Sequence, residues 1–185
     1  LVCTTCELCN LRCSAALPIE SSWMKLRGQL IDEEKKMTFP PFEMMAAATR
    51  SQGNIWVWYR KNRSAWFPED LNEKHGPGVQ SGNVYFAGCT ASYVENDIGM
   101  ASVRLLDEAG VDFTTLGEKE NCCATPMLVA GKWDVFKETM QKNIDAVKAA
   151  GYTSRSKDFY NNVAATLTAD KRFERVSRGV YKLAK

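Results

Sequence analysis

Four cysteines stand within eleven residues near the start of the chain, at Cys3, Cys6, Cys9 and Cys13. Spacers of two or three residues separate them, and such short spacers let neighbouring thiolates converge on one centre. A structural zinc site more often pairs two C-x2–4-C units across a longer gap. The spacing therefore favours an iron–sulfur cluster over the two alternatives, a zinc site and unligated thiols.

The full pattern of this loop is C-x2-C-x2-C-x3-C, the run found in bacterial ferredoxins. Ser14 stands where such a run usually has a proline. In two-cluster ferredoxins the fourth cysteine ligates the other cluster. We therefore expect a ferredoxin-like cysteine loop holding a [4Fe–4S] cluster, which Cys13 either closes or leaves for a second one.

Three further cysteines form a second group, with 32 residues between Cys89 and the adjacent pair Cys122 and Cys123. Two adjacent cysteines cannot easily bridge each other, because the linking peptide holds their side chains apart. They can both ligate one cluster. Burial as small hydrophobic residues is one alternative, and a thiol or disulfide redox site is another.

Seven cysteines, an odd and clustered number, argue against a secreted disulfide scaffold and for metal or redox chemistry in a reducing compartment. His75 is the one histidine of the chain, so catalysis by several histidines is excluded. No stretch approaches the roughly 18 apolar residues of a membrane span. Any membrane association would therefore go through a partner.

The elements that must position the second cysteine group alternate between strand and helix. Apolar patterns predict strands over Asn83–Ala87 and Val111–Leu116, and helices over Tyr93–Ala109 and Trp133–Ala150. This order implies an α/β unit with parallel strands. Both cysteine positions fall where a strand gives way to a loop, the usual place for a ligand site in such folds.

The segment between the two cysteine groups does not show this alternation of strands and helices. Helical spacing is found over Ser21–Lys36, and a short helix is expected over Phe42–Thr49. Gly53–Pro68 is aromatic and is expected to be strand-like or irregular. Asn72–Gly82 contains His-Gly-Pro-Gly and is interpreted as a linker.

Two stretches carry a resemblance to a known family: Phe86-Ala-Gly-Cys-Thr-Ala-Ser-Tyr93 and Asn121-Cys-Cys-Ala-Thr-Pro126. They resemble the cysteine-rich "CCG" domain of heterodisulfide reductases, a Rossmann-like unit. Within that group, residues 1–150 resemble the catalytic iron–sulfur subunit (DsrK) of the membrane complex linked to dissimilatory sulfite reductase. GEKENCCATPMLVAGKWDVF is a large part of that likeness.

The resemblance implies a role for each cysteine. Cys89, Cys122 and Cys123 would ligate a second, CCG-type iron–sulfur centre, which is the catalytic one. The four cysteines of the first loop would ligate the relay cluster that feeds it. The chain would be an oxidoreductase subunit that passes electrons to a disulfide or trisulfide of a small sulfur-carrier protein. It would work with other subunits of a membrane-bound redox complex, on the cytoplasmic side.

Two departures from the family pattern are visible. The glycine of the CCG motif is Ala124, a modest change if φ is negative there and a strained one if φ is positive. The family also places a Cys-x-x-Cys farther along the chain, at the end of a third strand. Residues 152–160 contain no cysteine. A complete catalytic centre is therefore not expected from this chain alone.

The last 34 residues are basic, with eight basic and three acidic side chains from Tyr152 onward, a net charge of +5. The preceding 151 residues hold 16 basic and 19 acidic residues, a net charge of −3. A helix over Phe159–Leu167 and a β-hairpin are expected, and the tail resembles the end of a HARE-type winged-helix domain. Its arginines could contact a phosphate backbone, which makes a nucleic-acid-binding module the alternative function; a solvated basic hairpin is the simpler interpretation.

The sequence thus predicts an α/β protein in four parts. Residues 1–20 form the cluster loop, 21–82 a helical and aromatic connection, 83–151 a partial CCG domain, and 152–185 a basic helix and hairpin.

Overall fold

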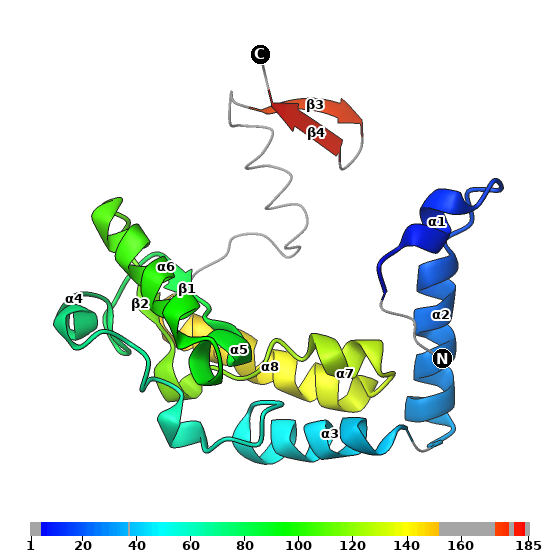
Figure 1. The fold of residues 1–185 in the computed structure, drawn as a ribbon, viewed down its shortest axis with the longest axis horizontal. Coiled ribbons are helices and arrows are strands. Elements are labelled where there is room, and N and C mark those ends of the chain that lie inside the picture. The colour runs from blue at the N-terminus through cyan, green and yellow to red at the C-terminus, as the bar shows by residue number, and fades with distance from the viewer. Residues whose placement is uncertain (1–4, 37, 152–172, 178–179, 184–185) are drawn as a thin grey trace. The chain divides into compact units, whose positions relative to one another are not determined.

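The computed structural model describes residues 5–36, 38–151, 173–177 and 180–183. The described part is mixed helix and sheet, and it is mostly helical (Figure 1). The chain divides into two compact units, Leu1–Tyr152 and Thr153–Lys185. Among the described residues, no helix has the length and the apolar character needed to cross a membrane.

The first unit contains eight described α-helices and two short strands. The helices are α1 (Leu8–Arg12), α2 (Ile19–Gly28), α3 (Pro40–Gln52), α4 (Asn72–His75), α5 (Gly88–Tyr93), α6 (Asn96–Glu108), α7 (Thr125–Val129) and α8 (Trp133–Ala149). A π-helical turn, η1 (Gln29–Glu33), follows α2, and the 3-10 turns are η2 (Arg60–Asn62), η3 (Glu69–Leu71) and η4 (Gly117–Lys119). The strands are β1 (Val84–Tyr85) and β2 (Thr114–Thr115).

The strands β1 and β2 pair in parallel, with Val84 opposite Thr114, which confirms the predicted parallel arrangement. Each is only two residues long, shorter than the predicted strands. The prediction of one helix over Tyr93–Ala109 is wrong at its start, because α5 ends at Tyr93 and α6 begins at Asn96. The Asn96 side-chain amide donates to the Ala91 carbonyl at 2.9 Å, which satisfies the end of α5 and fixes the break.

The connecting segment is more ordered than its sequence indicates. Helices α2 and α3 form as predicted, and Gly53–Pro68 is irregular apart from η2. The predicted linker, however, begins with α4, whose His75 is buried. Its ring nitrogens lie 2.9 Å from the Phe113 carbonyl and 2.9 Å from the Asp107 carboxylate. These two contacts fix α4 to the residue that precedes β2 and to α6.

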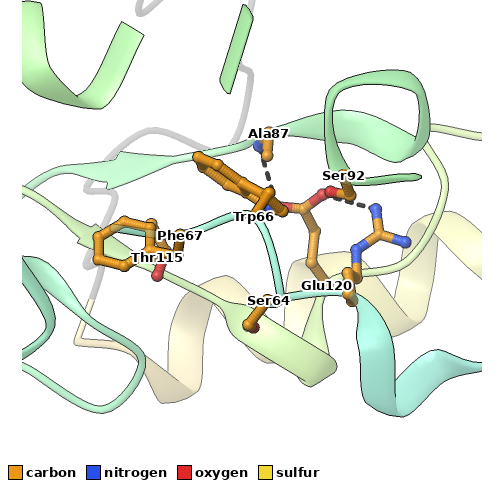
Figure 2. A pocket seen from close by; sticks show the side chains of 9 residues that line it. Ser64, Trp66, Phe67, Ala87, Ser92, Thr115 and Glu120 are labelled. Carbon is orange, nitrogen blue, oxygen red and sulfur yellow. Dashed lines mark hydrogen bonds and ion pairs between the residues drawn. The ribbon is translucent and has the colours of Figure 1, made fainter. Parts of the chain in front are cut away.

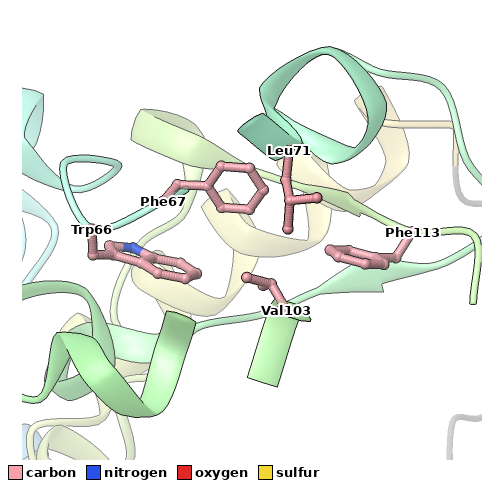
Figure 3. Close-up of a cluster of buried hydrophobic side chains, with 5 residues drawn as sticks. All are labelled: Trp66, Phe67, Leu71, Val103 and Phe113. Carbon is pink, nitrogen blue, oxygen red and sulfur yellow. The ribbon is translucent and has the colours of Figure 1, made fainter. Parts of the chain in front are cut away.

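Two hydrophobic cores lie beneath the cysteine-bearing loops. The first core consists of Trp66, Phe67, Leu71, Val103 and Phe113, and it supports the β1–β2 pair (Figure 3). The second core joins α3, α7 and α8 and consists of Ala46, Ala124, Met127 and Val135. Figure 1 shows these three helices side by side. The segment that carries Cys122 and Cys123 runs directly into the second core.

The second unit contains β3 (Phe173–Ser177) and β4 (Val180–Leu183), which pair antiparallel with Phe173 opposite Leu183. The expected helix over Phe159–Leu167 lies outside the described residues. Nucleic-acid contact by this tail therefore stays a prediction.

Candidate cysteine site

Cys89 sits in the first turn of α5, directly after β1. Gly88 begins this turn with φ of +77°, a backbone angle that glycine adopts without strain. The backbone amides of Ala87 and Gly88 donate to the Glu120 carboxylate at 3.0 and 2.8 Å. Cys89 is buried, with 6% of its surface exposed. The start of α5 is thus fixed by a charged side chain from another loop (Figure 2).

The loop between η4 and α7 presents Cys122 and Cys123. The Cys122 amide donates to the Gly53 carbonyl at 2.6 Å, and the Cys122 carbonyl accepts from the Asn143 side-chain amide at 2.9 Å. Asn143, buried on α8, also accepts from the Asn121 amide at 2.8 Å. Asn143 of α8 therefore holds both the Asn121 amide and the Cys122 carbonyl, and so fixes the backbone where the cysteine pair begins. Cys122 is buried, whereas Cys123 is exposed.

The structure brings the three predicted cysteines of this group together. The Cys122 thiol lies close enough to Cys89 and to Cys123 to affect the pKa of both. This proximity lowers the pKa of Cys89 to about 7, with a further contribution from the Arg63 charge and against the effect of burial. It also lowers the pKa of Cys123 to about 5. The pKa of Cys122 is raised, because its proton serves both neighbours and because the thiol is buried.

Thiolates are the ligands that iron–sulfur clusters require, so the donor set fits such a centre. Cys123 is poised as a thiolate near neutral pH, and Cys122 holds the proton that ligation would release. In the described part of the chain, no three His, Cys, Asp or Glu side chains are arranged to hold a metal ion. Ligation would therefore require loss of the Cys122 proton and a rearrangement of the three side chains.

Arg63 and Glu120 form a buried ion pair beside these sulfurs. Arg63 Nη2 lies 2.6 Å from Glu120 Oε1 and 3.9 Å from Cys89 Sγ. Sequence reasoning missed both residues, and it missed Asn143 as well. Glu120 stands two positions before Cys122, but Arg63 and Asn143 had no sequence signal, because each reaches the site only through folding.

The loop Asn54–Tyr59 lies against the same site, since the Ile55 backbone is close enough to Cys89 to help lower its pKa. Fully buried Asn54 holds the loop by accepting from the Trp56 and Trp58 amides and donating to the Trp58 carbonyl. Val57 adopts φ of +63°, which is rare for a β-branched residue. Beside the cysteines the loop exposes four large side chains, Trp56, Val57, Trp58 and Tyr59.

Ala124 replaces the glycine of the CCG motif, and its φ is +58°. Because φ is positive, the backbone at Ala124 is strained, which was the second of the two possibilities that the sequence left open. Its side chain is fully buried in the second core, where the methyl group packs with Met127 and Val135. Packing in this core offsets part of the cost of the left-handed backbone.

The first cysteine loop has a different character. Cys3 lies outside the described residues, Cys6 and Cys9 are exposed, and Cys13 is half-buried. Helix α1, which carries Cys9, contains no buried residue. The Glu20 amide of α2 donates to the Asn10 side chain of α1 at 2.9 Å, which joins the two helices. The predicted ligand role of these cysteines stays a prediction.

Residues 83–154 match the model of the CCG family, described as a cysteine-rich domain, and this confirms the resemblance found in the sequence. The match includes Cys89, Cys122 and Cys123. No solved structure matches the chain.

Three relatives show the range of similar proteins. A heterodisulfide reductase component from Methanosarcina acetivorans, of the dihydromethanophenazine:CoB–CoM type, is 33% identical over 82% of this chain and 36% of its own length. A Bacillus subtilis protein named "Probable iron-sulfur-binding oxidoreductase FadF" is 31% identical over 77% of this chain and 21% of its own. A component of the fumarate reductase (CoM/CoB) from Methanothermobacter marburgensis is 26% identical over 79% of this chain and 28% of its own.

The chain spans about a third of the length of the heterodisulfide reductase relatives that it matches, 36% in each case. Residues 83–154 thus match the CCG cysteine-rich family, and the homologues of the chain are heterodisulfide reductase components and other iron–sulfur oxidoreductases.

Proposed function

We propose that this chain is an iron–sulfur electron-transfer subunit of a heterodisulfide reductase-like oxidoreductase. The observation that carries the proposal is that folding brings Cys89 next to the adjacent pair Cys122 and Cys123, which lies more than 30 residues farther along the chain. The homologues named above support it. A bound cluster would supply one-electron chemistry at this position.

The protein's own residues would prepare the site for that chemistry. The three cysteines would bind the metal as thiolates, and Asn143 would keep the Cys122 backbone in place. A disulfide accepts two electrons and two protons to give two thiols, so a partner must deliver the electrons. In this proposal the cysteines Cys3, Cys6, Cys9 and Cys13 hold a [4Fe–4S] relay cluster between that partner and the CCG site.

We further propose that the electron acceptor is a disulfide or trisulfide on a small sulfur-carrier protein of dissimilatory sulfur metabolism. Other subunits of a membrane-bound complex would supply electrons on the cytoplasmic side. This finer assignment rests on the resemblance of residues 1–150 to the subunit linked to sulfite reductase. It predicts that a carrier-protein trisulfide oxidises the reduced chain faster than a small-molecule heterodisulfide does; equal rates would contradict it.

The decisive experiment is iron and sulfide analysis after anaerobic purification and reconstitution, followed by electron paramagnetic resonance. The wild-type protein should be brown and contain about four irons or more per chain, as one cubane cluster requires. Cys9→Ser should abolish the resonance of the relay cluster. Cys122→Ser should abolish a second resonance, in the complex whose partner supplies the ligands that this chain lacks. Each variant is the other's control, because the two substitutions remove ligands of different centres. A colourless, iron-free wild-type protein would refute the proposal.

A further inference from the structure

Helix α6 contributes one of its faces to the first core. Val103 is fully buried in that core, and Leu106 packs against it. Gly99, one turn before Val103, lies so close to Trp66 that an added Cβ would stand 2.7 Å from the indole ring. Positions three and four apart lie on the same side of a helix, so these residues define the inward face of α6.

The opposite face of α6 is apolar as well. Ile98 and Leu105 are 56% and 71% exposed, and Ala101 between them is also exposed. Val94, which precedes the helix, is exposed and continues the series. Spacings of four, three and four residues separate these side chains, and this alternation is typical of the contact seam between two paired helices. We call Val94, Ile98, Ala101 and Leu105 the α6 stripe.

The core does not account for the α6 stripe. A surface helix of a globular protein usually buries one apolar stripe and directs polar residues to solvent. In α6 the inward face fills that role, and the helix lies at the edge of the first unit (Figure 1). Contiguous exposed apolar side chains with a polar rim mark interaction sites. The α6 stripe therefore has the character of a docking surface.

The charges beside the α6 stripe indicate which kind of surface it fits. Glu95, Asp97 and Glu108 are exposed there, together with one base, Arg104. An anionic lipid surface attracts clusters of basic residues, so this acidic rim disfavours a membrane. The rim instead fits a surface that presents a base opposite Asp97 and an acid opposite Arg104.

A second copy of this chain presents an apolar stripe in the matching register. Two α6 helices can pack antiparallel about a twofold axis, with Ile98 of each copy opposite Ala101 of the other. In that register Leu105 of each copy lies opposite Val94 of the other. The small side chain of Ala101 lies near the axis, where it lets the two helices approach closely.

The same register also pairs the charges. It brings Asp97 of each copy opposite Arg104 of the other, and the twofold symmetry makes this pair twice. A parallel arrangement would instead bring Asp97 opposite the uncharged Ser102 of the second copy. The charge pattern therefore favours an antiparallel pair.

Arg104 is already held in place for such a contact. Its Nη1 and Nη2 donate to the two carboxylate oxygens of Asp70, at 3.0 and 3.1 Å. A guanidinium has five N–H donors, so it can bind a second carboxylate while it keeps the first. Pairing with Asp97 of a second copy thus requires no loss of the contact with Asp70.

We propose that the α6 stripe is a self-association surface, through which two copies of the chain form an antiparallel twofold dimer with reciprocal Asp97–Arg104 pairs. The inference involves no cysteine and is independent of the function proposed above. A seam of four side chains is short, so the dimer is weak and reversible.

Sedimentation equilibrium of the full chain tests the proposal, with a reductant present to prevent disulfides between copies. The wild-type protein should change from monomer to dimer between about 1 and about 500 μM, a range that covers weak affinities. Leu105→Glu should raise the dissociation constant roughly tenfold or more, because it places two like charges in the seam. Ile144→Glu, at an exposed apolar position of α8, is the matched control and should not change it.

Charge reversal tests the register. Asp97→Arg and Arg104→Asp each place like charges opposite one another and should weaken the dimer about tenfold at low salt. The double variant Asp97→Arg/Arg104→Asp restores both pairs and should restore the affinity, which neither misfolding nor a different partner would produce. Circular dichroism of the dilute variants would confirm that each one is folded.

Three results would overturn the inference. One is a wild-type protein that stays monomeric over the whole range, whether or not it sediments with phosphatidylglycerol vesicles. Another is a dimer that Leu105→Glu leaves intact. The third is a double variant no tighter than the single reversals.

Discussion

The two cysteine groups of this chain differ in what holds them. The described cysteines of the first loop lie on or beside α1, a five-residue helix with no buried side chain. Cys89 and Cys122, by contrast, are buried. A buried ion pair and an asparagine from α8 fix their backbones. The first group is defined by spacing along the chain, and the second by tertiary contacts.

This difference teaches how each site would acquire its cofactor. A short loop with closely spaced thiolates can wrap around a cluster, and the free energy of binding then orders the loop. Ligands from segments far apart in sequence need a preformed scaffold, because closing a long loop costs conformational entropy. We therefore expect the second site to be disrupted by mutations in its scaffold and the first to be nearly insensitive to them.

The largest effect is expected from Arg63→Met, which leaves the Glu120 carboxylate buried and unpaired. Removing one partner of a buried pair costs about 3–5 kcal/mol. Thermal or urea unfolding of the metal-free protein would measure the loss. Arg104→Met, at an exposed pair, should leave the unfolding midpoint almost unchanged. Equal effects of the two substitutions would show that the Arg63 pair is not part of a rigid scaffold.

A smaller loss is expected from Asn143→Ala. The substitution leaves the Asn121 amide and the Cys122 carbonyl without their partner, and an unsatisfied buried group costs about 1–3 kcal/mol. Binding of the CCG-type centre should weaken in parallel, as followed by iron content. Gln141→Ala, on the exposed part of the same helix, is the control. If iron content and stability match those of the control, Asn143 does not hold the site.

Two residues with left-handed backbones should respond differently to relief of strain. Val57 is exposed, so Val57→Asn removes backbone strain without loss of a core contact and should stabilise by about 1 kcal/mol. Ala124 is fully buried, so Ala124→Gly relieves a similar strain but loses a packed methyl worth about 0.8 kcal/mol. Its net effect on the free energy of unfolding should be close to zero.

Chemical denaturation of the two variants measures both changes. Ala124→Val serves as the reference for added strain and should destabilise clearly. A marked stabilisation by Ala124→Gly would mean that the alanine methyl contributes nothing to the second core.

The smallest effect on the metal-free protein is expected from Cys9→Ser. Cys9 is exposed, and α1 buries nothing, so the unfolding midpoint should not change. The same substitution should nevertheless reduce the iron content of the reconstituted protein. Differential scanning fluorimetry before and after reconstitution would separate the two effects. A lowered midpoint before reconstitution would show that the loop is structured without its metal.

Much of the secondary structure could be predicted because apolar periodicity is local. Helix α8 and the parallel pairing of β1 with β2 follow from such patterns. The break between α5 and α6 could not, because it depends on the Asn96 side chain reaching back to Ala91. The ordering of α4 depends on His75 bonding to residues more than 30 positions away. Non-local hydrogen bonds leave no periodic trace in the sequence.

The sequence by itself determined the chemistry of this protein: thiols in two groups, and a resemblance to the CCG family that residues 83–154 confirm. Only the tertiary structure decided which groups act on those thiols. It brought Arg63 to Cys89, Glu120 to the start of α5 and Asn143 to the Cys122 backbone. The physical reason is that residue type and spacing set which atoms can ligate a metal, whereas charge and hydrogen bonding at a buried sulfur depend on neighbours that only folding brings into contact.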